Sequence, residues 1–309
     1  MAGLPLYLFR VPTGNILTSV PQPGPLGGVF ARPELDAAGR ERAYAALLGR
    51  ALELAREKDC VALTVITNPF SPDLELTRRC LAPVLELENF TQFIRVTPGP
   101  EDPMPFEVQR RTNLSRNLKK AVEAGLTSAS CASEAEFEIW YAIHAARHRE
   151  IGAVPLSREL LANLLKCLRP ANKCELLLVK RGEELAAGTL FVWHRRVTDA
   201  FIMSMDSRFS AVAPNHISTR DELLAARARS GAVFNWQGSP SRESGVYVFK
   251  KQLWMSEERP YSFVTRLLVP PERVRAIGLE ETKQRYASHY LVPFGFFEDG
   301  NPEGRYVRA

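Results

Sequence analysis

The stretch Val233-Phe-Asn-Trp-Gln-Gly-Ser-Pro-Ser-Arg-Glu-Ser-Gly-Val-Tyr-Val-Phe-Lys-Lys-Gln-Leu-Trp254 joins an apolar start, a polar turn and an apolar element that ends in two cations. Val233 and Phe234 are typical of the end of a buried strand. The turn that follows, residues 237–241, is rich in glycine, serine and proline, which interrupt regular elements. A second apolar run, Gly245–Phe249, leads directly into Lys250 and Lys251. This order predicts a site for a polar or anionic group.

The rest of the composition indicates a globular protein. The chain has 309 residues, enough for two domains, with 45% apolar and 24% charged residues. No run of about 18 apolar residues occurs, and the N-terminal ten residues resemble a first strand rather than a signal peptide, so we expect a cytoplasmic protein without a transmembrane segment. A formal net charge of +5 and a pI of about 9.0 favour an anionic partner such as a nucleotide phosphate, a tRNA or an acidic membrane surface.

The cysteines give no sign of a disulfide framework or a metal site. They are odd in number and irregularly spaced, without a C-x-x-C motif or an adjacent histidine pair. We therefore expect no metal and reduced thiols that act as small core residues. The five are Cys60, Cys80, Cys131, Cys167 and Cys174.

The first 105 residues alternate helix and strand. Apolar periodicity predicts a helix over Glu34–Lys58, and the continuous apolar run Cys60–Ile66 predicts a buried strand. A short helix over Leu74–Leu81 and a strand over Phe90–Val96 follow. This alternation favours an α/β or α+β layered fold. Four prolines in the nine residues Thr97–Pro105 predict a domain junction there.

The second part begins with a basic helix over Arg110–Gly125, whose cations form either a solvated face or an edge that contacts phosphate. A helix over 215–229, capped by Asn215 or Ser218, is expected to leave N–H groups able to bind an anion. The other expected elements are a strand over 126–131, helices over 134–150 and 156–168, strands over 174–180, 185–194 and 198–205 with a hairpin turn at 181–184, a strand over 261–269, a basic helix over 270–290 and a loosely held tail from Pro293.

Three motifs in this part resemble those of one family. Arg116-Asn-Leu-Lys-Lys-Ala-Val-Glu-Ala-Gly125 resembles the "R-N-x-x-K-A-x-x-x-G" helix of the Fem-type (FemABX) aminoacyltransferases and their acetyltransferase-like relatives. Pro214, the helix to Ala228 and Gly231, then Asn235-Trp-Gln-Gly-Ser239, resemble the "P…A…G…F-x-x-G-S" block. Gly245-Val-Tyr-Val-Phe-Lys250 is similar to the "G-L-x-x-F-K" signature. The resemblance covers roughly residues 106–268, in the family's order.

The resemblance implies an α+β fold of two tandem GNAT-like domains with mixed central sheets flanked by helices. The first domain, residues 1–105, is degenerate, with the 270–309 tail as a candidate for completing it. The second, 106–269, is catalytic, and a C-terminal helix and tail occupy 270–309. A substrate cleft between the domains, into which Lys250 points, is part of this expectation. The family transfers an aminoacyl group from aminoacyl-tRNA to an amine, which makes tRNA the expected partner and leaves no tightly bound cofactor.

The family's chemistry needs a cation near the developing oxyanion or leaving hydroxyl. Lys250 aligns with the signature lysine, and we expect a carboxylate or phosphate beside it that keeps it charged. The alternative is a lysine that lies along the end of a strand, with Lys251 as the adjacent candidate. Asp206 is the candidate base, with His216 and Glu243 as further candidates, and a structural role is the simpler one for each of the three. The family often lacks an obligatory base, in which case substrate or solvent takes the proton.

The remaining candidates are expected to bind substrate, although core packing is the simpler role for Trp236. They are Arg116, Asn215, His216, Trp236, Gln237, Ser239, Glu243, Tyr247 and Lys251.

One departure bears on the donor. Enzymes that use acetyl-CoA carry a "Q/R-x-x-G-x-G/A" turn that binds pyrophosphate, whereas the corresponding place reads Arg208-Phe-Ser-Ala-Val-Ala213 and has neither glycine. Aminoacyl-tRNA is therefore favoured over acyl-CoA. The acceptor is open between a cell-wall precursor, an exopolysaccharide intermediate and a specialised metabolite. A catalytically silent tandem-GNAT binding module and an acetyl-CoA-dependent N-acetyltransferase are the alternatives.

Overall fold

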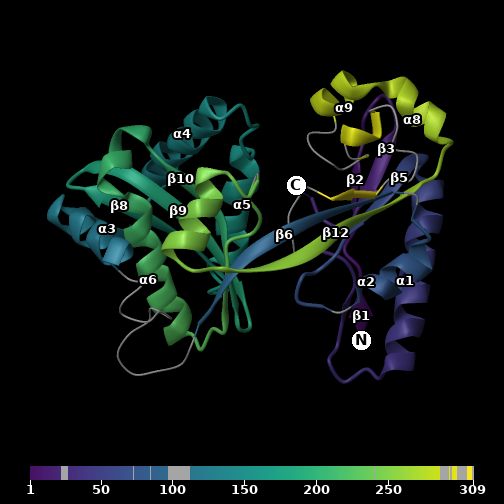
Figure 1. Cartoon of the computed structure of the whole chain (residues 1–309), viewed down its shortest axis with the longest axis horizontal. Coiled ribbons are helices and arrows are strands. Elements are labelled where there is room, and N and C mark those ends of the chain that lie inside the picture. Colours follow the sequence, from purple (N-terminus) through teal and green to yellow (C-terminus); the bar gives the residue numbers. More distant parts are fainter. Residues whose placement is uncertain are drawn as a thin grey trace. The chain divides into compact units, whose positions relative to one another are not determined.

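The computed structural model describes residues 1–21, 27–71, 73–83, 85–96, 112–239, 241–285, 292, 294–297 and 305–307. These residues form two units (Figure 1). The first combines Met1–Thr91 with Glu258–Ala309, and the second is Gln92–Glu257. The proline-rich segment at which we place the domain junction lies outside the described residues, and the predicted domain limits remain a prediction.

The first unit is built on a mixed sheet. Its strands follow the order β2 (Tyr7–Phe9), β3 (Asn15–Thr18), β5 (Cys60–Ile66), β12 (Glu257–Leu267) and β6 (Leu85–Arg95). β3 pairs with β5 in parallel, and β5 pairs with β12 antiparallel. β13 (Arg305–Val307) pairs in parallel with β6, and the short strands β1 (Ala2–Gly3) and β4 (Phe30–Ala31) pair with each other. The C-terminal part of the chain therefore completes the sheet that the N-terminal part begins.

Helices on the two faces of this sheet explain why every residue of β5 is buried. α1 (Ala37–Glu57) and α2 (Leu74–Leu81) share one apolar cluster with β5 and β12, in which Tyr44 and Leu48 contribute from α1. α8 (Pro271–Ile277) and the 3-10 turn η4 (Phe294–Phe297) contribute Val274 and Phe296 to a second cluster. A strand covered on both faces reads as a continuous apolar run, as β5 does in the sequence.

The second unit holds an ordered series of strands: β11 (Val233–Asn235), β10 (Val197–Met205), β9 (Glu184–His194), β8 (Cys174–Arg181) and β7 (Leu126–Ser130). The last residues of β6 pair antiparallel with β11. α3 (Thr112–Glu123) and α6 (Pro214–Ala228) cover one face, whereas α4 (Glu134–Glu150) and α5 (Arg158–Leu168) cover the other (Figure 1). The predicted α+β fold, the hairpin at 181–184 and the helix pair after β7 are confirmed.

The packing of α4 on β9 depends on a close contact between the Trp140 ring and the backbone of Gly188. The indole Nε1 of Trp140 donates to the carbonyl oxygen of Gly188 at 3.0 Å, and Trp140 is fully buried. A Cβ atom at position 188 would lie 2.4 Å from a Trp140 ring carbon. Glycine in the middle of this buried strand is therefore required by the helix packed on it.

Several sequence expectations are wrong in detail. The predicted helix over 270–290 is two short helices, α8 and α9 (Leu279–Arg285), which are separated by Gly278 at φ 81°; residues 286–290 lie outside the described part. The tail is not loosely held where it is described, because Phe296 is buried and β13 pairs with β6. The apolar element Gly245–Phe249 is helical: α7 (Gly245–Val248) runs into a π-helical turn, η3 (Phe249–Leu253). Cys167 is exposed, unlike the buried Cys60, Cys131 and Cys174.

Among the described residues, no helix has the length and apolar character needed to cross a bilayer. In the same part of the chain, no group of three or more histidine, cysteine, aspartate or glutamate side chains is arranged to hold a metal ion.

Candidate functional site

The strands β10 and β11 pair over only three residues and then separate. Val197–Asp199 align in parallel with Val233–Asn235, after which β11 ends and β10 continues to Met205. The register of β10 on β9 shifts between Ala200 and Ile202, so a bulge lies one residue beyond Asp199. Bulges redirect side chains and are frequent beside active sites. Polar groups at the last β10–β11 pair are thus placed where the sheet opens.

Lys250 lies on η3, with its ammonium directed into this region. Its Nζ donates to the carbonyl oxygens of Trp236 at 3.0 Å and Gly238 at 2.6 Å, and the residue is 6% exposed. Burial lowers the pKa of Lys250 to about 7, and the charge of Asp199 acts in the opposite direction. The π-helical turn that carries Lys250 is a rare conformation that occurs mostly at functional sites. The interpretation of Lys250 as a lysine along a strand end is wrong, because this side chain points inward from a helix.

Asp199 is the carboxylate that faces this ammonium group. Its Oδ1 accepts from Gln237 Nε2 at 3.2 Å and, more weakly, from Asn235 Nδ2 at 3.5 Å. Burial raises the pKa of Asp199 to about 7, against the two amide hydrogen bonds and the charge of Lys250. Asp199 as a residue is half-buried. No ion pair joins the described side chains of Asp199 and Lys250, so they interact through space.

The two groups together can store or transfer a proton near neutral pH. Desolvation disfavours the charged form of each, which raises the pKa of Asp199 and lowers that of Lys250 until the two meet. Groups with pKa values close to the working pH are the most effective general acids and bases.

Amide and hydroxyl groups of neighbouring residues hold the turn whose carbonyl groups bind Lys250. Gln92, on β6, accepts from Ser239 Oγ at 2.5 Å and donates to Ser256 Oγ at 3.2 Å. Its backbone N–H donates to the carbonyl oxygen of Gln237 at 2.9 Å, and its own carbonyl accepts from Trp236 N–H at 2.8 Å. Gln237 adopts φ 59°, which is uncommon for a residue with a side chain and is maintained by these contacts.

An aromatic cluster packs behind the lysine. The rings of Trp236, Trp254, Phe249 and His216 lie 5.1 to 6.4 Å apart by centroid. Burial lowers the pKa of His216 to about 4, so its imidazole is neutral at pH 7, and its Nε2 lies 3.3 Å from Asn117 Nδ2. The other ring nitrogen of His216 and the Nε1 atoms of Trp236 and Trp254 have no partner among the described residues. Trp236 is 4% exposed, in accord with its core-packing role.

The structure brings some of the predicted residues together. Lys250, Trp236, Gln237, Ser239, Tyr247 and His216 all contribute to this region, Tyr247 through its carbonyl oxygen, which lies 3.5 Å from Gln92 Nε2. By contrast, Arg116, Glu243 and Lys251 are exposed, and Arg116 contacts Asn113. The sequence reasoning missed Asp199, Asn235, Gln92 and Ser256. An aspartate inside an otherwise apolar strand was the signal that could have identified Asp199.

Asp206 has a different environment from the one expected for a base. Its carboxylate accepts from the backbone N–H of Arg208 at 2.9 Å and forms an ion pair with the guanidinium of the same residue at 2.7 Å. The Arg208 side-chain hydrogen bonds lower the pKa of Asp206, which makes it a weaker base. Asp206 thus caps the 3-10 helix η2 (Ser207–Val212).

The N-terminus of α6 also differs from the expected capped helix. The helix begins at Pro214 after Ala213, which has φ 55° and makes no side-chain cap. Ser218 Oγ bonds the carbonyl oxygen of Asn215, and Asn215 Oδ1 has no partner among the described residues. The prediction that Asn215 or Ser218 caps the helix is wrong.

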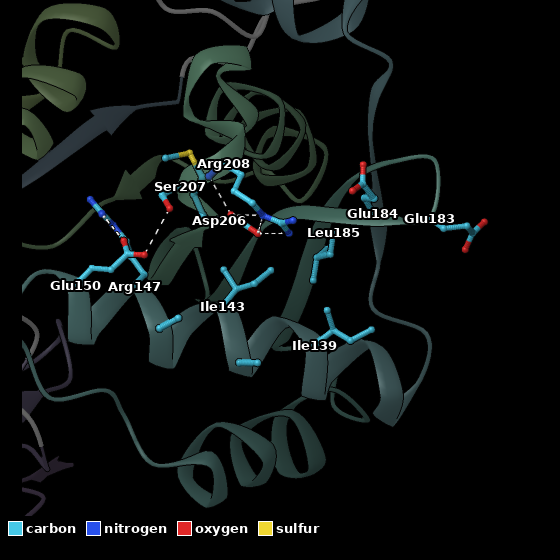
Figure 2. Close-up of a pocket in the computed structure, with 13 residues that line it drawn as sticks. Ile139, Ile143, Arg147, Glu150, Glu183, Glu184, Leu185, Asp206, Ser207 and Arg208 are labelled. Carbon is cyan, nitrogen blue, oxygen red and sulfur yellow. Dashed lines mark hydrogen bonds and ion pairs between the residues drawn. The ribbon is translucent and has the colours of Figure 1, made fainter.

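A pocket of about 530 Å³ lies on the α4 side of the second unit (Figure 2). Side chains from α4, from the turn between β8 and β9, and from the end of β10 with the start of η2 line it. Ile139, Ile143 and Leu185 give it an apolar part, and Glu150, Glu183 and Asp206 lie around them.

Comparisons with known proteins agree with this architecture. Residues 108–251 match the family of acetyltransferase (GNAT) domains. No curated protein matches the sequence. The solved structure of FemX is 13% identical with a TM-score of 0.59, and the match covers 84% of this chain and 83% of that one, so it extends over both units.

Two further solved structures show a similar degree of likeness. The C-terminal domain (DUF2156) of a putative lysylphosphatidylglycerol synthetase from Agrobacterium fabrum is 11% identical with a TM-score of 0.60, covering 90% of this chain and 84% of that one. L-PGS from Bacillus licheniformis is 11% identical with a TM-score of 0.59, covering 84% and 80%. At such identities the likeness establishes the fold alone.

Proposed function

We propose that this chain, which carries an acetyltransferase-type (GNAT) domain over residues 108–251, is an N-acyltransferase of the Fem type that transfers an aminoacyl group from aminoacyl-tRNA to an amine. The observation that carries the proposal is the buried ammonium group of Lys250, which the carbonyl oxygens of Trp236 and Gly238 hold where β10 and β11 separate, with the Asp199 carboxylate acting on it through space. Acyl transfer to an amine needs one group that accepts a proton and another that supplies one.

The proposed reaction uses both groups. The amine of the acceptor attacks the ester carbonyl carbon, a C–N bond forms, and the C–O bond to the terminal ribose of the tRNA breaks. Ionised Asp199 takes the proton that the amine loses, and protonated Lys250 gives a proton to the leaving ribose oxygen. One proton thus passes in net terms from amine to ribose hydroxyl, and exchange with solvent or between the two side chains restores their starting forms.

The bound lysine also supplies positive charge where negative charge develops. Its ammonium is held by the carbonyl oxygens of Trp236 and Gly238, so its position is fixed before the reaction. Preorganised donors of this kind typically contribute about 10²–10³-fold in rate. Gln92, through Ser239 and the backbone of Gln237, positions the turn rather than the substrate.

The segment after β10 supports aminoacyl-tRNA over acyl-CoA. Residues 207–212 form a 3-10 helix rather than a glycine-rich turn with free amide groups, and Asp206 places a carboxylate at its start. The overall charge of +5 suits a donor as anionic as tRNA. The acceptor candidates remain a cell-wall precursor, an exopolysaccharide intermediate and a specialised metabolite. A phospholipid headgroup is a further candidate, because a structural neighbour is described as a putative lysylphosphatidylglycerol synthetase.

A single-turnover assay tests the donor. The full chain is mixed with a tRNA pool charged with radiolabelled amino acids and, as amine acceptor, a UDP-linked muramyl pentapeptide with a free lysine amine, while a parallel reaction contains acetyl-CoA and the same acceptor. We expect acceptor-dependent loss of the aminoacyl ester. Lys250→Met should slow it by about 10²-fold, and Asp199→Asn by about 10²-fold, whereas Lys166→Met, at an exposed position of α5, should not change it.

The remaining outcomes separate the alternatives. Release of CoA thiol without loss of aminoacyl ester would replace this proposal with an acetyl-CoA-dependent N-acetyltransferase. Consumption of neither donor, across acceptors that include lysine peptides, aminosugars and phosphatidylglycerol vesicles, would instead support a catalytically silent binding module. Equal rates for the wild-type chain and Lys250→Met would contradict the role of Lys250.

A further inference from the structure

The pocket between α4 and the β8–β9 turn has no part in the chemistry proposed for Lys250. The pocket and Asp199 lie at opposite ends of β10. Asp199 is near the start of the strand, and Met205, which lines the pocket, is its last residue. Six residues of extended strand span roughly 20 Å. The pocket is therefore a separate feature of the second unit, and its volume of about 530 Å³ lies in the range of small-molecule sites.

One part of the lining is apolar: Leu185 is buried in the core, whereas Ile139 remains exposed. Ile139 projects from α4 into the pocket with 54% of its surface exposed, and Ile143 and Leu185 lie beside it (Figure 2). Met205 adds a flexible apolar side chain from the end of β10. A hydrocarbon segment seated here would remove exposed apolar surface from water, which stabilises the bound state.

The charged part of the lining is acidic. The lining includes four carboxylates, those of Glu150, Glu183, Glu184 and Asp206, and two guanidinium groups, so it carries two net negative charges. Both guanidinium groups are already bound within the pocket wall: Arg147 pairs with Glu150 at 2.9 Å and Arg208 with Asp206 at 2.7 Å. An anionic ligand would have to compete with these carboxylates for its partners.

We propose that this pocket binds a cation attached to an apolar chain, namely an alkylammonium group such as a lysine side chain or a linear diamine. The hydrocarbon part lies against Ile139, Ile143 and Leu185, and the ammonium group lies toward Glu183 and Glu184 at the hairpin turn. Glu183 forms no ion pair with another described residue, whereas Glu184 pairs with Arg181 at 3.0 Å. Glu183 is thus the carboxylate with the most capacity for a new ammonium partner. The inference does not depend on the acyl donor or on Lys250.

The test uses the full chain and two probes of similar apolar length and opposite charge, 1,5-diaminopentane and hexanoate, at low ionic strength. Isotopically labelled isoleucine and leucine methyl groups locate binding by NMR, and titration gives the dissociation constant. We expect 1,5-diaminopentane to shift the methyl signals of Ile139, Ile143 and Leu185 and hexanoate to leave them unchanged. Glu183→Lys should weaken diamine binding roughly tenfold, the effect of about 1.4 kcal/mol.

A second variant and a control keep the result interpretable. Ile139→Ser, at an exposed helix position, removes apolar contact without changing charge and should also weaken diamine binding. Glu159→Gln, an exposed carboxylate on α5 outside the pocket, should leave it unchanged. No methyl shifts with the diamine, equal shifts with hexanoate, or binding that is indifferent to both Glu183→Lys and Ile139→Ser would overturn the proposal. These outcomes are separate from the acyltransfer assay, because none involves Lys250 or a donor.

Discussion

Burial raises the pKa of Asp199 and lowers the pKa of Lys250, so the two residues make opposite contributions to the pH dependence of stability. The folded-state pKa of Asp199 is raised from 3.8 to about 7, so the folded chain binds this proton more tightly than the unfolded chain does. The stability contributed by Asp199 is therefore fully present below about pH 4 and is lost as the pH rises to about 7. For Lys250 the pKa falls from 10.5 to about 7, and its contribution to stability rises between pH 7 and about 10.5.

Replacement of Asp199 by asparagine tests this assignment. As the pH rises from about 4.5 to about 7, the unfolding free energy of the wild-type chain should fall relative to that of Asp199→Asn. Other buried groups that titrate in this range, His144, His216 and Glu222, are common to both proteins and cancel in the difference. Urea denaturation followed by tryptophan fluorescence is the measurement, since all four tryptophans lie in the second unit.

The matched control is Glu159→Gln at an exposed position of the second unit. A pH-independent difference for Asp199→Asn would show that the carboxylate is not perturbed by burial. In the same variant the pKa of Lys250 should fall further, because the negative charge that raises it is gone. NMR of the lysine side-chain carbons, assigned with Lys250→Met, reads this change directly.

Glu222 is a second buried carboxylate, and its role is structural. It is 1% exposed and pairs with Arg229, whose guanidinium also lies 3.9 Å from the Trp193 ring centroid. Arg229→Met would leave the carboxylate buried and unpaired, which should destabilise the second unit by about 3 kcal/mol. The double variant Glu222→Gln with Arg229→Met should recover much of this loss. Circular dichroism is the suitable readout, and a single-variant cost close to zero would contradict the assigned pairing.

At the scale of elements, the contact between Trp140 on α4 and Gly188 on β9 can be tested by substitution. Gly188→Ala would place a methyl group 2.4 Å from the ring of fully buried Trp140, so something must shift. We expect a loss of about 1–3 kcal/mol in stability. Gly49→Ala is the control, since nothing lies within 4 Å of its added methyl group, and in mid-helix it should stabilise by about 0.5–1 kcal/mol. Equal thermal shifts for the two variants would refute the packing argument.

Helices and strands could be predicted from the sequence where the pattern of apolar residues matches the faces that the fold buries. β5 is apolar throughout because both faces are covered, and Gly182 in the left-handed region closes the hairpin between β8 and β9. The basic segment over 270–290 was predicted as one helix, but Gly278, at φ 81°, separates α8 from α9. The π-helical turn at Phe249–Leu253 has no sequence signature of its own.

The candidate site was only partly predictable, for a related reason. Motif resemblance identified Lys250 and the turn that binds it, but Asp199 depends on amides 36 and 38 positions away and on burial that no local pattern records. Asp206 was the more obvious acid, since it follows a strand directly. Its carboxylate is occupied by Arg208, two residues further on.

At the scale of the whole molecule, the two units differ in how the chain builds them. The second unit is one continuous segment, Gln92–Glu257, whereas the first needs residues from both ends. β12 lies between β5 and β6 in the first unit and contributes Phe263 and Val264, which are 2% and 0% exposed. An N-terminal fragment without β12 therefore lacks a central strand of its own sheet.

Fragments test this division. A chain of residues 92–257 should fold alone, with the dispersed methyl NMR spectrum and cooperative urea unfolding of a single domain. A chain of residues 1–91 should not, because the backbone edges of β5 and β6 that β12 joins in the sheet would have no strand to pair with. Co-expression of residues 1–91 with residues 258–309 should restore cooperative unfolding, since it returns β12 and α8 to their partners. Cooperative unfolding of residues 1–91 alone would contradict this, because it would show that the sheet is complete without β12.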